Sequence, residues 1–268
     1  MDTICICGES GSGKDTVADL LREALGGVKM ALADPMKRLV QALMGFSDDQ
    51  LWGPSQSRNT VDERITPQFL AQVIIRVLSH EATPEKAQLN LLLQFVPDKD
   101  AARGAFFKWL RTMAEKAESG PLSPRIVLQT LGTEFGRAVD PNLWVKIGCW
   151  TREQLLGGGY YYTAQRGLVA DPQAFINLVY ITDCRFRNEV LAFNALGATM
   201  IRVLTGVQLP PATHASELEQ RSIPNHWFYY VIQNRKSDGI EALRRLVLAI
   251  SSSWAFTADD WSTGGYAQ

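Results

Sequence analysis

The sequence contains few of the residues that build metal clusters, membrane spans or disulfide scaffolds. Its 268 residues include 3 His and 4 Cys, and the spacing of the cysteines fits no metal site, so we expect reduced core thiols. There is no apolar run of about 18 residues and no secretory signal pattern, which argues against a membrane partner. A net charge of −1 argues against a nucleic-acid partner. These absences favour a cytoplasmic protein that acts on small molecules.

What the sequence does contain is a phosphate-binding pattern at its start. Residues 3–7 are apolar and largely β-branched and predict a buried strand, and apolar residues at helical spacing over 17–25 predict a helix. Between them Gly8, Gly13 and Lys14 satisfy the P-loop pattern GxxxxGK. Backbone N–H groups of such a loop surround phosphate oxygens, and the helix N-terminus adds partial positive charge. Because strand and helix both flank the loop, we prefer a phosphate site to a glycine-rich turn without a ligand.

The residue after the lysine departs from the general pattern. Asp15 stands where a Ser or Thr is expected as the Mg²⁺ ligand, and Thr16 follows one place later. We expect Lys14 to face solvent and to reach the outer phosphates. A second apolar strand, over 175–182, ends in Asp183, which is the form of a Walker B segment whose carboxylate meets Mg²⁺ or its water shell.

Two further stretches are typical of ligand-binding positions. The strand predicted over 28–33 ends in Asp34, followed by Pro35, Lys37 and Arg38, and the carboxyl end of a strand is where open α/β sheets bind ligands. Asp34 has an alternative role as a helix N-cap. For the two cations, a phosphate role and plain solvation are equally supported.

The second stretch is a helix that begins at Ser123-Pro124. Its polar face carries a row at steps of four: Arg125, Gln129, Thr133 and Arg137. Gly132 and Gly136 lie beside this row, and a glycine inside a helix costs about 1 kcal/mol relative to Ala. Such glycines indicate a close approach to the backbone. We prefer a ligand to a neighbouring helix, because the row offers hydrogen-bonding groups.

Strands alternate with helices along the chain, which predicts an α/β fold with a mostly parallel sheet of five strands and right-handed crossovers. We expect one P-loop NTPase domain, a three-layer α/β/α sandwich, over residues 1–252. Within it, residues 46–123 carry helical patterns and no strand pattern, so they predict a helical insertion. Residues 253–268 are expected to form a loosely held tail. His214 stands alone in a proline-rich loop, and we do not assign it to catalysis.

The chain also carries more cations near predicted ligand positions than one nucleoside triphosphate requires. They are Lys14, Lys37, Arg58, Arg125, Arg137, Arg185 and Arg187. Phosphoryl transfer depends on positioning and on cations around the transferred group. This set therefore suits two phosphorylated ligands, a donor and an acceptor.

Five motifs together resemble one family of kinases. They are GSGKDT (11–16), ADPMK (33–37), LWGPS (51–55) with Arg58-Asn59, LQTLGTEFGR (128–137) with Trp144, and DCRFRNE (183–189). In this order, over the chain to about residue 234, they resemble the deoxynucleoside monophosphate kinases of tailed bacteriophages, whose P-loop also ends in Lys-Asp-Thr. The resemblance implies the fold of P-loop nucleoside monophosphate kinases. It implies transfer of the ATP γ-phosphate to a deoxynucleoside 5′-monophosphate, with Mg²⁺, in the host cytoplasm if the chain is phage-encoded.

The resemblance also implies roles for particular residues. The ATP phosphates would be held by Gly8, Gly11, Ser12, Gly13, Lys14, Asp15 and Thr16. Mg²⁺ would be positioned by Asp15 or Thr16 together with Asp183. The acceptor phosphate or the transition-state charge would be held by Lys37, Arg58, Arg137 and Arg185. The nucleoside would be bordered by Gln129, Gly132, Thr133 and Trp144, with Asp34 at the acceptor site and Glu189 supporting Arg185 or contacting the acceptor. Catalysis would rest on Lys14, Arg137, Asp183 and Arg185.

Two other functions stay open from the residues. One is a P-loop kinase for another small acceptor, such as a pantetheine-type (dephospho-CoA-like) substrate. The other is a nucleotide-binding module without activity, since Asp15 places a negative charge beside the phosphates. The accepted bases are not determined by the sequence. If the protein is a homodimer, the helical insertion is the expected contact surface.

Overall fold

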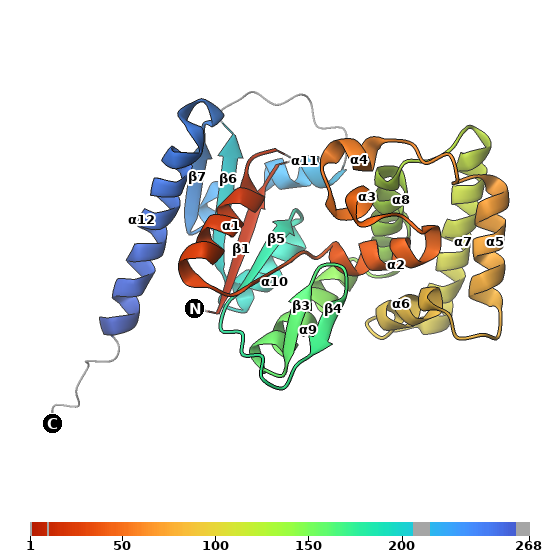
Figure 1. The fold of residues 1–268 in the computed structure, drawn as a ribbon, viewed down its shortest axis with the longest axis horizontal. Helices are drawn as coiled ribbons and strands as arrows, with labels where there is room; N and C mark the ends of the chain where they lie inside the picture. Colours follow the sequence, from red (N-terminus) through yellow and green to blue (C-terminus); the bar gives the residue numbers. More distant parts are fainter. Residues whose placement is uncertain (1, 10, 206–214, 261–268) are drawn as a thin grey trace. The chain divides into compact units, whose positions relative to one another are not determined.

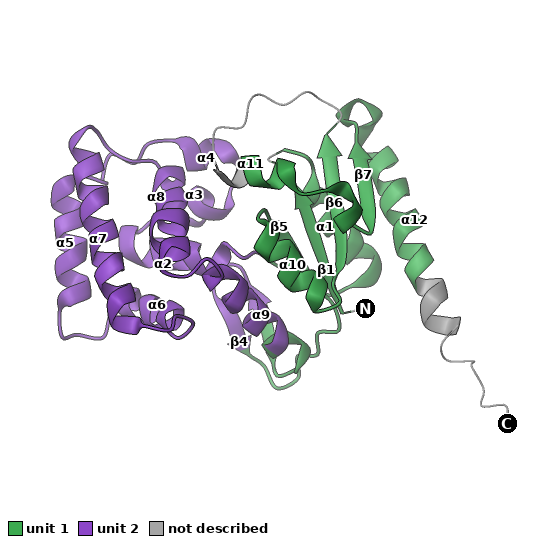
Figure 2. Ribbon diagram, turned by 180° about the vertical axis from the view of Figure 1, so that it is seen from behind, with its two compact units in different colours: residues 1–30, 154–161, 170–268 green, residues 31–153, 162–169 purple. Residues whose placement is uncertain are grey.

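The computed structural model describes residues 2–9, 11–205 and 215–260, and the chain divides into two compact units (Figure 2). Unit 1 comprises residues 1–30, 154–161 and 170–268, and unit 2 comprises residues 31–153 and 162–169. The observed division differs from the predicted one, a single domain over 1–252 with an insertion at 46–123. The second unit contains more residues than that insertion, because the chain leaves unit 1 directly after the second strand.

Unit 1 is built on a five-stranded sheet in which every neighbouring pair of strands is parallel. Its order is β2-β5-β1-β6-β7 (Figure 1). The strands are β1 (Thr3–Gly8), β2 (Val28–Met30), β5 (Val179–Cys184), β6 (Thr199–Thr205) and β7 (Tyr230–Asn234). The prediction of a parallel sheet of five strands is thereby confirmed. Because parallel strands all end at one edge, the residues that follow β1 and those that end β5 lie at the same edge.

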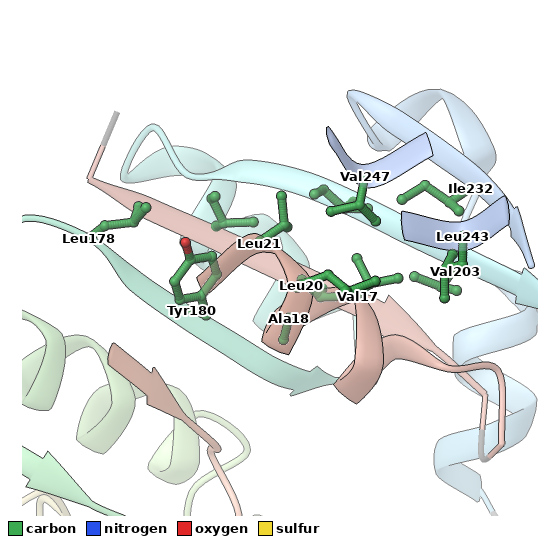
Figure 3. Packing of buried hydrophobic residues seen from close by; sticks show 13 residues of the cluster. Val17, Ala18, Leu20, Leu21, Leu178, Tyr180, Val203, Ile232, Leu243 and Val247 are labelled. Atoms are coloured by element: carbon green, nitrogen blue, oxygen red, sulfur yellow. The ribbon is translucent and has the colours of Figure 1, made fainter. Parts of the chain in front are cut away.

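Helices cover both faces of this sheet and complete the predicted three-layer α/β arrangement. They are α1 (Lys14–Leu25), α10 (Arg187–Ala195), α11 (Ala215–Ser222) and α12 (Gly239–Asp260), with 3₁₀ turns η2 (Asn225–Trp227) and η3 (Lys236–Asp238). Val17 and Leu21 of α1 and Leu243 and Val247 of α12 share one buried cluster with the sheet side chains on that face (Figure 3). On the other face, Arg202 of β6 donates hydrogen bonds to carbonyl oxygens in and after α11.

Two boundaries in unit 1 differ from the prediction. β5 begins at Val179 rather than at residue 175, and it contains Asp183 instead of ending before it. Helix α12 continues to Asp260, so its helical backbone extends into the residues predicted as a C-terminal tail. Apolar residues pack the first part of α12 against the core. The helix then continues through the small residues where the tail was predicted to begin. The loop that contains His214 and the last residues, 261–268, lie outside the described residues.

Unit 2 is mainly helical. It contains α2 (Asp34–Met44), α3 (Asp48–Trp52), α4 (Ser55–Asn59), α5 (Pro67–Leu78), α6 (Pro84–Leu93), α7 (Lys99–Glu118), α8 (Pro124–Thr130), the π-helix η1 (Leu131–Arg137) and most of α9 (Leu143–Leu156). The predicted helix starts before Pro67, Pro84 and Pro124 are confirmed, because the preceding Thr66, Thr83 and Ser123 side chains each cap the helix. Its core includes Phe106, whose ring contacts those of Trp109 and Phe135.

A two-stranded sheet of β3 (Tyr160–Thr163) and β4 (Gly167–Ala170) follows α9, in a stretch where the sequence indicated a loop or hairpin. None of the helices within the described ranges is long and apolar enough to cross a membrane.

Candidate active site

The glycine-rich loop after β1 has the backbone that its sequence predicts. Gly11 and Gly13 adopt positive φ angles of 76° and 91°, which side chains other than hydrogen rarely allow. Gly8 is required for a different reason, because a Cβ atom there would lie 2.7 Å from the carbonyl oxygen of Val203 on β6. The loop is therefore shaped by its glycines, and it ends at Lys14, the first residue of α1.

Lys14 is more buried than expected. The residue is 8% exposed rather than facing solvent, and its Nζ lies 3.6 Å from Oδ2 of the largely exposed Asp15. The N-terminus of α1 adds the partial positive charge of its free N–H groups at the same place. Ser12 is also buried, at 1% exposure, and its hydroxyl finds no hydrogen-bond partner among the described residues, of which Ser10 is not one. A buried lysine and an unsatisfied hydroxyl are what a loop made for an anionic ligand would show.

Asp183 lies in the strand adjacent to the one that leads into this loop. β5 pairs with β1 so that Cys184 is opposite Cys7, the residue before Gly8. Asp183 is half-buried, and it ends the apolar part of its strand at the edge where the loop begins. The structure thus brings the predicted Walker B carboxylate and the glycine-rich loop to one edge of the same sheet in unit 1.

The segment after β5 is held by a buried carboxylate. Oε2 of Glu189, which is 4% exposed, accepts hydrogen bonds from the backbone N–H groups of Arg185 (2.7 Å) and Phe186 (3.1 Å). Glu189 therefore supports Arg185 through its backbone, one of its two expected roles, and the structure gives no support to contact with an acceptor. The Arg185 side chain is exposed. Arg187 instead donates to the Ser222 carbonyl oxygen and lies over the Trp227 ring, which is a structural role.

In unit 2, Asp34 is the centre of a buried hydrogen-bond network. Its carboxylate accepts from the Trp52 indole N–H (2.9 Å), the Tyr162 hydroxyl (3.0 Å) and the Ala31 backbone N–H (3.0 Å). Asp34 is 2% exposed, and Lys37 Nζ lies 3.8 Å from it. Burial, together with the charge of Asp34, raises the pKa of Tyr162. The expected role of Asp34 as the side-chain cap of α2 is wrong, because Ala33 is the N-cap residue and makes no side-chain cap. Its expected role as a substrate ligand stays a prediction.

Lys37 and Arg38 separate into two different roles. The Lys37 ammonium group lies 5.7 Å from the centre of the Trp52 ring, and its side chain is 15% exposed. Arg38 donates to the Ala164 carbonyl oxygen (2.9 Å) and stacks over Tyr162, which ties α2 to the β3–β4 turn. Of the two cations, Arg38 is structural, and Lys37 remains a candidate phosphate ligand.

The predicted polar row on the helix after Ser123 is interrupted by a change of helix type. α8 ends at Thr130 and a π-helix continues over Leu131–Arg137, so steps of four no longer keep side chains in one line. Thr133 donates its hydroxyl proton to the Gln129 carbonyl oxygen (2.7 Å). Gln129, Thr133 and Arg137 are each half-buried. They stay candidates for acceptor binding, although not as a straight row.

The two glycines of this helix are explained by neighbouring side chains, which corrects the preferred interpretation that a ligand approaches them. A Cβ at Gly136 would lie 2.6 Å from Cε2 of Trp144, and one at Gly132 would lie 3.1 Å from Sδ of Met36. The indole N–H of Trp144 donates to the Gly132 carbonyl oxygen (3.1 Å), and Trp144 is 6% exposed. Gly132 and Trp144 therefore have packing roles, and nothing in the structure supports their contact with a nucleoside.

Two further predicted cations are Arg58 and Arg125. Arg58 lies on α4, is half-buried, and donates to the Ser55 hydroxyl (3.3 Å). The Nε atom of Arg125 is buried without a hydrogen-bond partner among the described residues.

The roles of Trp52 and Tyr162 were not predicted from the sequence. Both side chains donate hydrogen bonds to Asp34, which is 18 and 128 positions away from them in the chain.

A parallel α/β sheet whose first strand runs through a glycine-rich loop and a lysine into a helix defines a fold of the P-loop kinase class. Comparison with known proteins makes the assignment more specific. The family model for deoxynucleotide monophosphate kinase matches residues 2–221, and the chain belongs to that family. It is also similar to a protein of Acanthamoeba polyphaga mimivirus whose provisional name is deoxynucleotide monophosphate kinase. The two are 24% identical over 226 residues, which cover 84% of this chain and 86% of the mimivirus protein.

Proposed function

We propose that this nucleotide kinase transfers the γ-phosphate of ATP to a deoxynucleoside 5′-monophosphate. An oxygen of the acceptor phosphate forms a bond to the γ-phosphorus, the bond from that phosphorus to the β–γ bridging oxygen breaks, and ADP leaves with the electron pair. The products are ADP and the deoxynucleoside diphosphate, which serves nucleotide synthesis. The reaction takes place in the cytoplasm, which is the host cytoplasm if the gene is a phage gene. The observation that carries the proposal is the loop from Gly8 to Lys14 in a chain of this kinase family.

At the donor end, the loop supplies backbone N–H groups and α1 supplies its N-terminal charge. Lys14 is the cation nearest to the transferred group, as the lysine of such loops reaches the outer phosphates. Its burial strengthens this role, because a cation shielded from water interacts more strongly with phosphate charge than an exposed one does.

Mg²⁺ fits the oxygen donors at this end. The described residues contain no group of three or more His, Cys, Asp and Glu that could hold a metal by themselves. Mg²⁺ does not need one, since it keeps several waters and binds through one or two carboxylates and the substrate phosphates. Asp183, with Asp15 or Thr16, would hold the ion, which neutralises charge on the phosphates when bound.

At the acceptor end, we propose that cations hold the acceptor phosphate and the charge of the transition state. These are Lys37, Arg58, Arg137 and Arg185. Gln129 and Thr133 offer polar groups to the nucleoside. Asp34, Gly132, Trp144 and Glu189 stay proposed at the acceptor site on the resemblance alone, and each also has a packing or hydrogen-bonding role within its own unit.

The direct test is an acceptor panel. The purified protein is incubated with Mg²⁺-ATP and each deoxynucleoside monophosphate, with ribonucleoside monophosphates as controls, and the diphosphates formed are measured. We expect transfer to at least one deoxynucleotide. Transfer only to another small acceptor, such as a pantetheine-type compound, would replace this proposal with the alternative kinase, and binding of ATP without any transfer would favour a non-catalytic module.

A substitution in the loop tests the site itself. Lys14→Met removes the charge while filling much of the same space, and we expect turnover to fall at least about 100-fold because transition-state charge loses a cation. The matched control is Lys29→Met, since Lys29 lies in the same unit and pairs with Asp19 at the surface. Thermal melting confirms that both variants fold. Wild-type turnover in folded Lys14→Met would contradict the site assignment.

A further inference from the structure

The turn after β7 lies against the glycine-rich loop, although it is more than 200 residues away in sequence. β7 ends at Asn234, and the turn Lys236–Asp238 follows it before α12 begins. Two side chains of this segment, Asn234 and Lys236, approach the loop. The sequence motifs include neither residue, and both belong to unit 1 together with the loop.

Asn234 holds one peptide group of the loop in a fixed direction. Its Nδ2 donates a hydrogen bond of 2.8 Å to the carbonyl oxygen of Ser12. The peptide bond from Ser12 to Gly13 is trans and planar, so its N–H points away from its carbonyl oxygen. By holding the Ser12 carbonyl oxygen, Asn234 therefore sets the direction of the Gly13 N–H, one of the backbone donors that such a loop turns toward phosphate.

The same contact explains why residue 13 has no side chain. A Cβ atom at Gly13 would collide with the amide of Asn234. The positive φ of 91° already favours glycine at this position, and the amide adds a second, independent reason. Both the backbone conformation and the Asn234 amide therefore require glycine at position 13.

Lys236 adds a positive charge near Gly11 of the loop. Its Nζ lies 3.9 Å from where a Cβ of Gly11 would stand. The residue is exposed, and no ion pair involves its ammonium group within the described part of the chain. A flexible ammonium group this close to the loop backbone can reach a phosphate chain bound in the loop.

We propose that the turn after β7 is part of the donor-nucleotide site: Asn234 is a positioning residue for the loop, and Lys236 binds the phosphate chain of the donor. This inference rests on the proposed function, because it assumes that the loop holds a nucleoside triphosphate. It predicts that the donor site extends beyond the five sequence motifs to the last strand of the sheet.

The test for Lys236 is a binding measurement. Affinities for ATP, ADP and adenosine are measured by calorimetry in the wild type, in Lys236→Ala, and in Arg245→Ala, which removes an exposed charge from α12 of the same unit. We expect Lys236→Ala to weaken ATP binding about tenfold, ADP binding less, and adenosine binding not at all. Equal affinities for ATP in Lys236→Ala and the wild type would overturn the role of Lys236.

The test for Asn234 uses an exchange that keeps the side chain's shape. Asn234→Asp replaces the donor amide with a carboxylate oxygen that faces the Ser12 carbonyl oxygen, and Gln233→Glu makes the same chemical change at an exposed neighbour. We expect Asn234→Asp to lower kcat/KM for ATP at least about 30-fold with no change in KM for the acceptor, and Gln233→Glu to have little effect. Asn234→Ala, which lacks the repulsion, should fall between them.

The outcomes separate this inference from the proposed function. If the wild type transfers phosphate and Asn234→Asp and Lys236→Ala do so with unchanged kinetics for ATP, only this inference fails. A rise in KM for the acceptor as large as the rise in KM for ATP would also overturn it, since a general distortion of the protein would then explain the effect. If the wild type neither binds ATP nor transfers phosphate, the proposed function fails and this inference fails with it.

Discussion

A single glycine inside a helix predicts a close contact with its backbone, but the sequence does not predict which group makes that contact. Gly132 and Gly136 stand inside a helix where glycine is unfavourable, which predicts a close contact. The contact exists, but it is made by Met36 and Trp144 and not by a ligand. The polar residues around the glycines could not distinguish the two cases, because the side chain that fills each space comes from another segment.

This explanation predicts opposite effects for two identical substitutions. Gly136→Ala should lower the free energy of unfolding by about 1–3 kcal/mol, because its methyl group overlaps the Trp144 indole and forces it to shift. Gly104→Ala, on the exposed face of α7 with no atom within 4 Å of the new methyl group, should raise it by about 0.5–1 kcal/mol. Urea unfolding of both variants measures the difference. Stabilisation by both would show that Trp144 yields without cost.

At the scale of elements, local signals were the most reliable. Thr66, Thr83 and Ser123 cap helices where the Thr-Pro or Ser-Pro pairs predicted, since a cap and its helix are adjacent in sequence. The π-helix over Leu131–Arg137 had no such signal. One of its carbonyl oxygens, that of Gly132, accepts from the Trp144 indole, which belongs to the next helix, so its stabilisation depends in part on a tertiary contact.

The segment between α4 and α5 is held by a carboxylate whose charge should make the stability of unit 2 depend on pH. Asp62 accepts hydrogen bonds from Arg64 Nη2 (2.7 Å) and Gln50 Nε2 (2.9 Å). The Arg64 guanidinium, and then the Gln50 amide, lower the pKa of Asp62 to about 2, against burial, which raises it. The ordinary value for an unfolded chain is about 3.9.

A folded-state pKa below the unfolded one stabilises the protein at higher pH. The contribution of Asp62 is therefore complete above about pH 5 and is lost as the pH falls toward 2. It amounts to at most about 2.5 kcal/mol, and solvent around the half-exposed Arg64 reduces it. Asp62→Asn should thus lower stability at pH 7 and show a shallower loss between pH 5 and pH 2, measured by urea unfolding. Parallel pH profiles for the two proteins would contradict the assigned pKa.

At the scale of the whole molecule, the order of strands and helices along the chain was sufficient to predict the fold class. Five strands with intervening helices predict a parallel sheet because parallel neighbours need crossover connections. The spatial order β2-β5-β1-β6-β7 was not predictable from the chain, because β2 and β5 are neighbours although all of unit 2 is inserted between them in sequence. The residue range of unit 2 could not be predicted either, because its first helix follows β2 as any crossover helix would.

The donor loop and most of the proposed acceptor residues belong to different units, with Arg185 of unit 1 as the exception, which gives the last prediction. The proposed donor residues from Gly8 to Thr16 belong to unit 1, and Arg58, a proposed acceptor residue, belongs to unit 2. We therefore expect Lys14→Met to weaken ATP binding at least about tenfold with little change in deoxynucleotide binding, and Arg58→Ala to do the reverse, because each removes a charged contact to one phosphate group. Calorimetry with each ligand alone measures both affinities. In the double variant the two losses should add, as they do for residues without shared partners, whereas loss of both ligands in either single variant would mean that the two sites are not separable.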